Sequence, residues 1–110
     1  MAKFEHTVSG SFNQLLTKIE NGILEGSVSA TLEESSDFCS GDARCSVRVF
    51  ERYSYFGGNR VSLSVTLFQN ADEPVRISAI TSGGSQAVFF KVNTLGEEAF
   101  LDKLREILEG

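Results

Sequence analysis

The sequence contains few of the residues on which enzyme and metal chemistry usually depends. Its 110 residues include no tryptophan, one proline, one histidine and two cysteines. One histidine and two cysteines are too few for a four-ligand zinc site within one chain. The spacing of Cys39 and Cys45 does not match a redox CxxC pair, and only His6 could activate a cysteine nucleophile. We therefore predict no metal, no cofactor and no catalytic residue.

Long apolar runs and phosphate-binding motifs are also lacking. No stretch approaches 18 consecutive apolar residues, so the sequence predicts no membrane span. The first ten residues, MAKFEHTVSG, have no apolar run after Lys3 and do not resemble a secretory signal. We therefore expect a cytoplasmic protein with reduced thiols. The segment Ser82-Gly83-Gly84-Ser85 lacks the lysine and the following helix of a P-loop, and it predicts a hairpin turn.

What the sequence does contain fits one domain over residues 1–110. A chain of this length can bury a single hydrophobic core, and 41% of its residues are hydrophobic. The formal net charge of −5 argues against nucleic acid as a default partner.

Two stretches have the apolar spacing of amphipathic helices. We predict one helix over residues 12–24 and a second over residues 95–109. Serine or threonine followed three residues later by glutamine or glutamate is typical of a capping box at a helix start. The candidate starts are Ser11 with Gln14 and Thr94 with Glu97, and the candidate ends of the first helix are Asn21-Gly22 and Gly26.

Alternation of apolar and polar residues predicts the strands. They are expected over residues 4–8, 27–32, 45–50, 61–68, 75–80 and 87–92. Residues 33–42 are polar and acidic, and we predict a loop there. Cys45, Val47 and Val49 are expected to face the core, although this alternation fails at Glu51, where a bulge or a sheet edge is predicted.

Together these elements predict an α+β fold with two layers. Strands joined by short turns are antiparallel neighbours, and a sheet with one apolar face needs cover on one side only. We therefore expect a single antiparallel sheet of about five or six strands with both helices on one face. The element order is β-α-β4-α or β-α-β5-α. At the level of fold this order is similar to one repeat of the TATA-box-binding protein and to the helix-grip ligand carriers.

Four segments carry a resemblance to a protein family. They are RCSVRVFERY at residues 44–53, GNRVSL at 58–63, SAITSGGSQA at 78–87 and GEEAFLDKL at 96–104. Together they resemble a domain-of-unknown-function family of small bacterial proteins, and the resemblance covers nearly the whole chain. It implies no activity, cofactor or catalytic residue.

The polar face of the predicted sheet is the best candidate for a functional surface. Arginine suits anions and aromatic rings, and exposed aromatic groups among arginines are typical of protein interfaces. The candidate binding residues are Arg48, Arg52, Ser62, Ser64, Thr66, Phe68, Arg76 and Ser78. Beside them we expect Ser27, Ser29, Thr31 and Ser46, with the apolar groups of Phe50, Ile80 and Phe89.

Several functions stay open at this point. The first is a non-enzymatic binding or protein-interaction module that uses this face, with a homodimer as the simplest case. The second is a small enzyme or ligand carrier with a pocket between the sheet and the C-terminal helix, lined by Arg48, Tyr53 or Tyr55. A nucleic-acid binder is disfavoured by the net charge, and a small anionic ligand is a further alternative. The face could also be an ordinary solvated surface.

Overall fold

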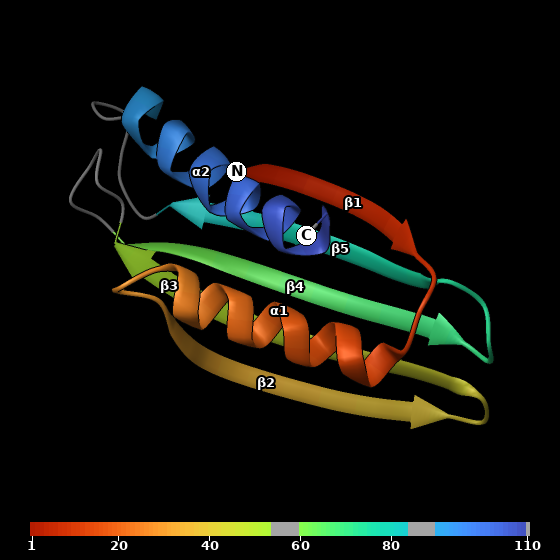
Figure 1. The fold of residues 1–110 in the computed structure, drawn as a ribbon. Coiled ribbons are helices and arrows are strands. Elements are labelled where there is room, and N and C mark those ends of the chain that lie inside the picture. The colour runs from red at the N-terminus through yellow and green to blue at the C-terminus, as the bar shows by residue number, and fades with distance from the viewer. Residues whose placement is uncertain (54–59, 84–89, 110) are drawn as a thin grey trace.

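The computed structural model describes residues 1–53, 60–83 and 90–109, and within the last segment it describes side chains from Glu97 onward. In chain order the elements are β1 (Ala2–Val8), α1 (Phe12–Gly26), β2 (Thr31–Ser40), β3 (Ala43–Tyr53), β4 (Arg60–Asn70), β5 (Val75–Gly83) and α2 (Phe90–Glu109) (Figure 1). The described strands form one five-stranded antiparallel sheet in the order β1-β5-β4-β3-β2. The predicted α+β class is confirmed, with five strands.

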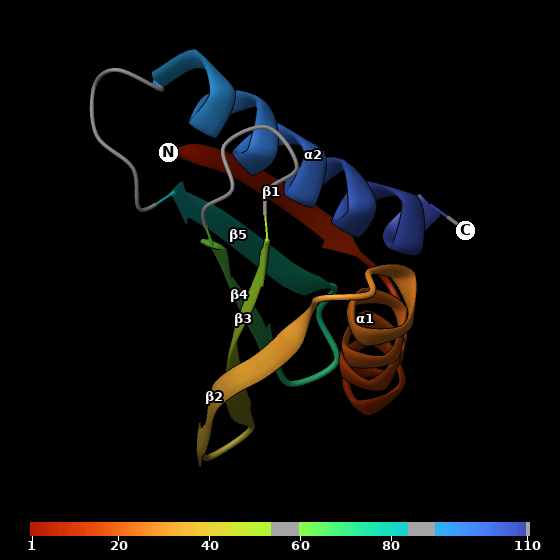
Figure 2. The ribbon, with the colours of Figure 1, turned by 90° about the vertical axis from the view of Figure 1, so that its left-hand side faces the viewer.

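Both helices lie on the same side of the sheet, as the edge-on view shows (Figure 2). The apolar alternation of two strands explains this arrangement. Val61, Leu63, Val65 and Leu67 on β4 are all buried, and Val75, Ile77 and Ala79 on β5 are buried with them. The helices contribute the rest of the core through Phe12, Ile19, Ile23, Phe100, Leu101 and Leu104.

For β3, the sequence predicted the wrong side of the strand to face the core. Phe50 is 0% exposed and pairs across the sheet with the buried Leu63, so Phe50 faces the helices. Val47 and Val49, which alternate with it, therefore lie on the other side of the sheet. Cys45 lies with them, opposite Phe68. The side of β3 that faces the helices is therefore its polar side, and three arginines on that side contact the helices.

The prediction for β2 is displaced along the chain. The strand begins at Thr31 and includes most of the acidic stretch that we expected to be a loop. Val28, expected in a strand, is fully exposed in the connection before it. Every residue of β2 is exposed, so the strand forms through backbone pairing with β3 and not through burial of an apolar face.

The helix boundaries agree with the sequence at both ends of α1, whereas α2 begins earlier than expected. The Ser11 hydroxyl accepts a hydrogen bond from the Gln14 backbone N–H, which confirms the first capping box. Of the two candidate ends, the helix passes Asn21-Gly22 and ends at Gly26. The second helix begins at Phe90, so Thr94 is not its cap and residues 90–92 are not part of a strand. Residues 54–59 and 84–89 lie outside the described residues, and they include Tyr55, Phe89 and the second half of the turn expected at Ser82-Gly83-Gly84-Ser85.

Gly22 has a packing role in the middle of α1. A Cβ built on Gly22 would lie 2.6 Å from Cδ1 of Ile107 on α2. Real contacts are never this short, so the absence of a side chain lets the two helices approach each other.

Candidate functional site

The side of the sheet away from the helices is the candidate functional surface, and we call it the open face. The strand registers place the following residues on it: Lys3, Glu5 and Thr7 (β1), Arg76, Ser78, Ile80 and Ser82 (β5), Arg60, Ser62, Ser64, Thr66 and Phe68 (β4), Cys45, Val47, Val49, Glu51 and Tyr53 (β3), and Thr31, Glu34, Ser36 and Phe38 (β2). Six of the eight predicted binding residues share this face. Among the described residues, no helix covers it.

Arg48 and Arg52, the other two predicted residues, lie on the opposite side of β3. They alternate with Val47 and Val49 and point toward the helices together with Phe50. Arg52 donates a hydrogen bond to the Ser27 hydroxyl at 2.7 Å, and its guanidinium lies 4.4 Å from the Phe100 ring centroid. The open face therefore carries only Arg76 of the three arginines expected there.

The neighbouring serines also lie apart from the open face. Ser27 and Ser29 precede β2, and the Ser29 hydroxyl accepts a hydrogen bond from the Tyr53 N–H. Ser46 is buried on the helix side, where its hydroxyl donates to Asp37 at 2.6 Å. Of this group, Thr31 alone shares the open face, where it is paired with Glu51.

Arg48 forms an ion-pair network beneath α1. The residue is 8% exposed, and its Nε donates to Glu20 on α1 at 2.7 Å. Its Nη1 lies 2.9 Å from Asp37 on β2. Burial acts to lower the pKa of Arg48, but its hydrogen bonds to Glu20 and Asp37 outweigh burial and raise it. The hydrogen bonds from Ser46 and Arg48 lower the pKa of Asp37 below its ordinary 3.8. The network thus has a structural role: it fastens β2 and β3 to α1.

The third arginine of β3, Arg44, also contacts α1. Arg44 donates to the Asn13 side chain, and its guanidinium lies 4.2 Å from the ring centroid of Phe12. The side of β3 that alternates arginine with serine and phenylalanine thus serves as the helix-packing side. Val47 and Val49 alternate with these residues and therefore lie on the open face.

Four apolar side chains lie on the three inner strands of the open face. Val47 and Val49 are half-buried on β3, while Phe68 and Ile80 are 39% and 43% exposed on β4 and β5. Sequence reasoning placed Phe68 and Ile80 on this face, as the structure does. It missed Cys45, Val47 and Val49. Their signal was present at Glu51, because the residue that failed to fit an inward position is on the open face with them.

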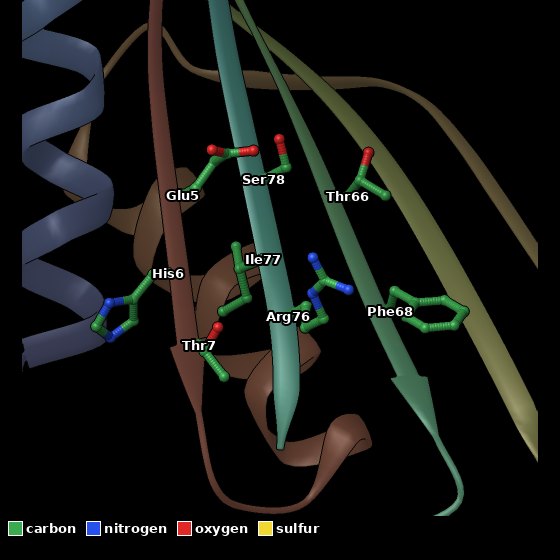
Figure 3. Close-up of a pocket in the computed structure, with 8 residues that line it drawn as sticks. All are labelled: Glu5, His6, Thr7, Thr66, Phe68, Arg76, Ile77 and Ser78. Atoms are coloured by element: carbon green, nitrogen blue, oxygen red, sulfur yellow. The ribbon is translucent and has the colours of Figure 1, made fainter. Parts of the chain in front are cut away.

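Two hollows formed by described residues are shallow, and neither is an enclosed pocket. One has a volume of about 530 Å³ on the open face and is lined by Glu5, Thr7, Thr66, Phe68, Arg76 and Ser78, with His6 and Ile77 at its border. Figure 3 shows Arg76 and Phe68 side by side on adjacent strands, with His6 directed away from them. The second, of about 560 Å³, lies between α1 and the β2–β3 hairpin. Both are open to solvent, so neither surrounds a small substrate.

The thiols and several charged groups of the described residues have defined surroundings. No group of three or more histidine, cysteine or acidic side chains within them is arranged to hold a metal ion. Cys39 and Cys45 are free thiols on opposite sides of the sheet. Arg60 donates to Glu51 at 2.8 Å, and this hydrogen bond raises the pKa of Arg60. No described helix is long and apolar enough to cross a membrane.

Comparison with known proteins identifies the family. A family of unknown function, DUF6054, matches residues 1–110, and the chain belongs to it. This agrees with the resemblance to a domain-of-unknown-function family seen in the sequence. No curated protein and no solved structure matches the chain.

Proposed function

We propose that this member of the DUF6054 family is a non-enzymatic protein-interaction module whose open face packs against the surface of another protein chain. The observation that carries the proposal is the set of apolar side chains on the three inner strands of that face. Phe68 on β4 and Ile80 on β5 are each about two-fifths exposed there, and Val47 and Val49 are half-buried on β3. Apolar groups gathered on one face indicate an interaction surface more strongly than the same groups scattered singly.

The polar residues of the open face suit close contact with a protein. Ser62, Ser64, Thr66 and Ser78 have short side chains, so a second surface can approach the backbone closely and hydrogen-bond to the hydroxyls. The formal charges balance, because the cations of Lys3, Arg60 and Arg76 match the anions of Glu5, Glu34 and Glu51. A surface with an apolar centre and a charged, balanced periphery resembles an interface core and its rim.

The alternatives receive less support from the structure. An open hollow does not bury most of a small ligand, as carrier and enzyme pockets do. Arg48 and Tyr53, suggested above for an enzyme pocket, lie on opposite sides of β3. Single-stranded nucleic acid needs an excess of positive charge beside its aromatic platforms, and the open face has no such excess.

We also propose a more specific fold assignment and a cellular location for the chain. We place the chain near one repeat of the TATA-box-binding protein because its elements follow the β-α-β4-α order. That likeness concerns fold alone and does not transfer a function. We also propose a cytoplasmic location, where both thiols are reduced.

The two cysteines provide a test, because Cys45 lies on the open face and Cys39 on the helix side. In cells that naturally produce the chain, we expect alkylation of native Cys45 to be at least about fivefold slower than in dilute purified protein. Cys39 is exposed and away from the covered face, so its rate should stay the same. Mass spectrometry of the two cysteine peptides after a brief iodoacetamide pulse gives both rates. Equal Cys45 rates in cells and in dilute solution would show that nothing covers the open face.

A further inference from the structure

We infer that the partner of the open face is a second copy of this chain, packed face to face about a two-fold axis parallel to β4. The inference rests on the proposed function, since it assumes that the open face is an interaction surface. What it adds is the identity of the partner and the geometry of the pair. The evidence is the order of side chains across the sheet.

One row of side chains crosses all five strands and is complementary to itself when its order is reversed. In strand order from β2 to β1 it is Glu34, Val49, Ser64, Ile80 and Lys3. The row thus runs from an acid through an apolar group, a hydroxyl and a second apolar group to a base. Its central residue lies on β4, the middle strand of the sheet.

A two-fold axis parallel to β4 places this row on itself in reverse. A position along a strand is kept by that rotation, while β1 exchanges with β2 and β5 exchanges with β3. Glu34 then faces Lys3 of the second copy, Val49 faces Ile80, and Ser64 faces Ser64. A two-fold interface must be self-complementary, and this row meets that requirement in charge and in polarity.

Two further rows, which lie toward the Asn70 end of β4, are compatible with the same axis. One row reads Ser36, Val47, Thr66, Ser78 and Glu5, so its reversal brings Glu5 opposite the Ser36 hydroxyl and brings Thr66 opposite itself. The next reads Phe38, Cys45, Phe68, Arg76 and Thr7. Reversal of this row places the exposed Phe68 opposite Phe68 of the second copy. In neither of these two rows do like charges face each other.

The other face-to-face two-fold axis, in the plane of the face and perpendicular to the strands, is less favourable. It would pack β1 on β1 and β2 on β2. The exposed Lys3 and Glu34 would then lie toward residues of their own edge strand, and Glu34 would lose the opposite charge. The axis parallel to β4 brings unlike edges together, and unlike charges favour association. It also places Arg60 of β4 opposite its own copy, and there each guanidinium is ion-paired with Glu51 of the same chain.

The size and twist of the sheet determine how strongly we expect the two copies to associate. Aligned sheets cross at roughly 30°, which displaces the outer strands by about 5 Å along their length. Lys3 and Glu34 have long, exposed side chains that span such an offset. Five strands about 4.8 Å apart and about seven residues long at 3.3 Å each present roughly 550 Å² of flat area. This is near the lower end of stable interfaces, so we expect a dimer that dissociates on dilution.

Charge reversal across the axis tests the inference by light scattering at low salt over a range of concentrations. Lys3→Glu and Glu34→Lys should each weaken dimerisation about tenfold, because each places like charges together at two symmetry-related points. The double variant restores opposite charges and should recover most of the affinity. Both residues are exposed, so the fold should be unchanged. Val28→Glu, at a fully exposed valine outside the open face, is the control and should have no effect.

Each outcome separates the inference from the proposed function. If the double variant is as weak as the single variants, or if the parent chain stays monomeric at millimolar concentration, the second copy is not the partner in this geometry. If Cys45 is nevertheless protected in cells, a different protein covers the open face and the proposed function stands. A monomeric parent together with unprotected Cys45 overturns both.

Discussion

Replacement of Phe50 with alanine should lower the free energy of unfolding by about 3–5 kcal/mol, the usual cost of removing a buried phenylalanine side chain. Phe50 is 0% exposed and belongs to the core cluster, where it pairs with Leu63 across β3 and β4. The loss combines the transfer of the ring to water with the cavity that it leaves. Urea unfolding followed by far-ultraviolet circular dichroism measures the change.

Phe68→Ala is the matched control, because it removes the same side chain from the neighbouring strand. Phe68 is 39% exposed on the open face, so its truncation should cost no more than about 1.5 kcal/mol when the chain is monomeric. The comparison tests which side of β3 faces the core. Similar losses for the two variants, or a larger loss for Phe68→Ala, would contradict the assignment of the open face.

Removal of the negative charges around Arg48 should have the second large effect. In the Glu20→Gln/Asp37→Asn variant, the amide oxygens can still accept hydrogen bonds, but the buried guanidinium has lost both carboxylates. A buried charge without a counter-charge is costly, and we expect a loss of about 2–4 kcal/mol in unfolding free energy. Chemical denaturation at neutral pH measures it.

A third substitution distinguishes this cause from a general disturbance of packing. Adding Arg48→Met to the double variant removes the buried cation that has lost its counter-charges. The free energy of unfolding should therefore rise by at least about 1 kcal/mol. The control is Asp102→Asn, which breaks an exposed ion pair with Arg105 and should cost about 0.5 kcal/mol or less. A further loss of stability on adding Arg48→Met would contradict the account of this network.

The sequence predicted those elements whose burial depends on their own apolar pattern. On β4, Leu63 and Val65 alternate with hydroxyl residues, so the core side is evident from local residues alone. The apolar stripe of α1 has the same property, and it places Ile19 and Ile23 in the core. For such segments the two-layer arrangement followed directly, and six of the eight predicted binding residues were placed on one face.

The prediction failed where burial depends on partners distant in sequence. Arg48 can be buried because Glu20 lies 28 residues before it and Asp37 lies on the neighbouring strand. Local alternation on β3 therefore favoured the valines as core residues over the arginines. Glu51 was the available clue, because reversing the faces of β3 removes the conflict at that position. Strand β2 was predicted too early in the chain because an exposed edge strand has no apolar alternation to detect.

Position 64 gives the most direct test of the claim that two copies pack through their open faces, because Ser64 lies on β4 at the middle of the self-complementary row. We would introduce Ser64→Cys into a chain that also carries Cys39→Ser and Cys45→Ser, and treat it with a short bis-maleimide. If two copies pack about an axis along β4, the two introduced thiols face each other and a covalent dimer forms rapidly. Thr7→Cys on β1 is the control, since that axis would separate its two thiols by about 20 Å across four strand spacings. Equal cross-linking at the two positions, or none at position 64 at millimolar protein, would contradict the claim.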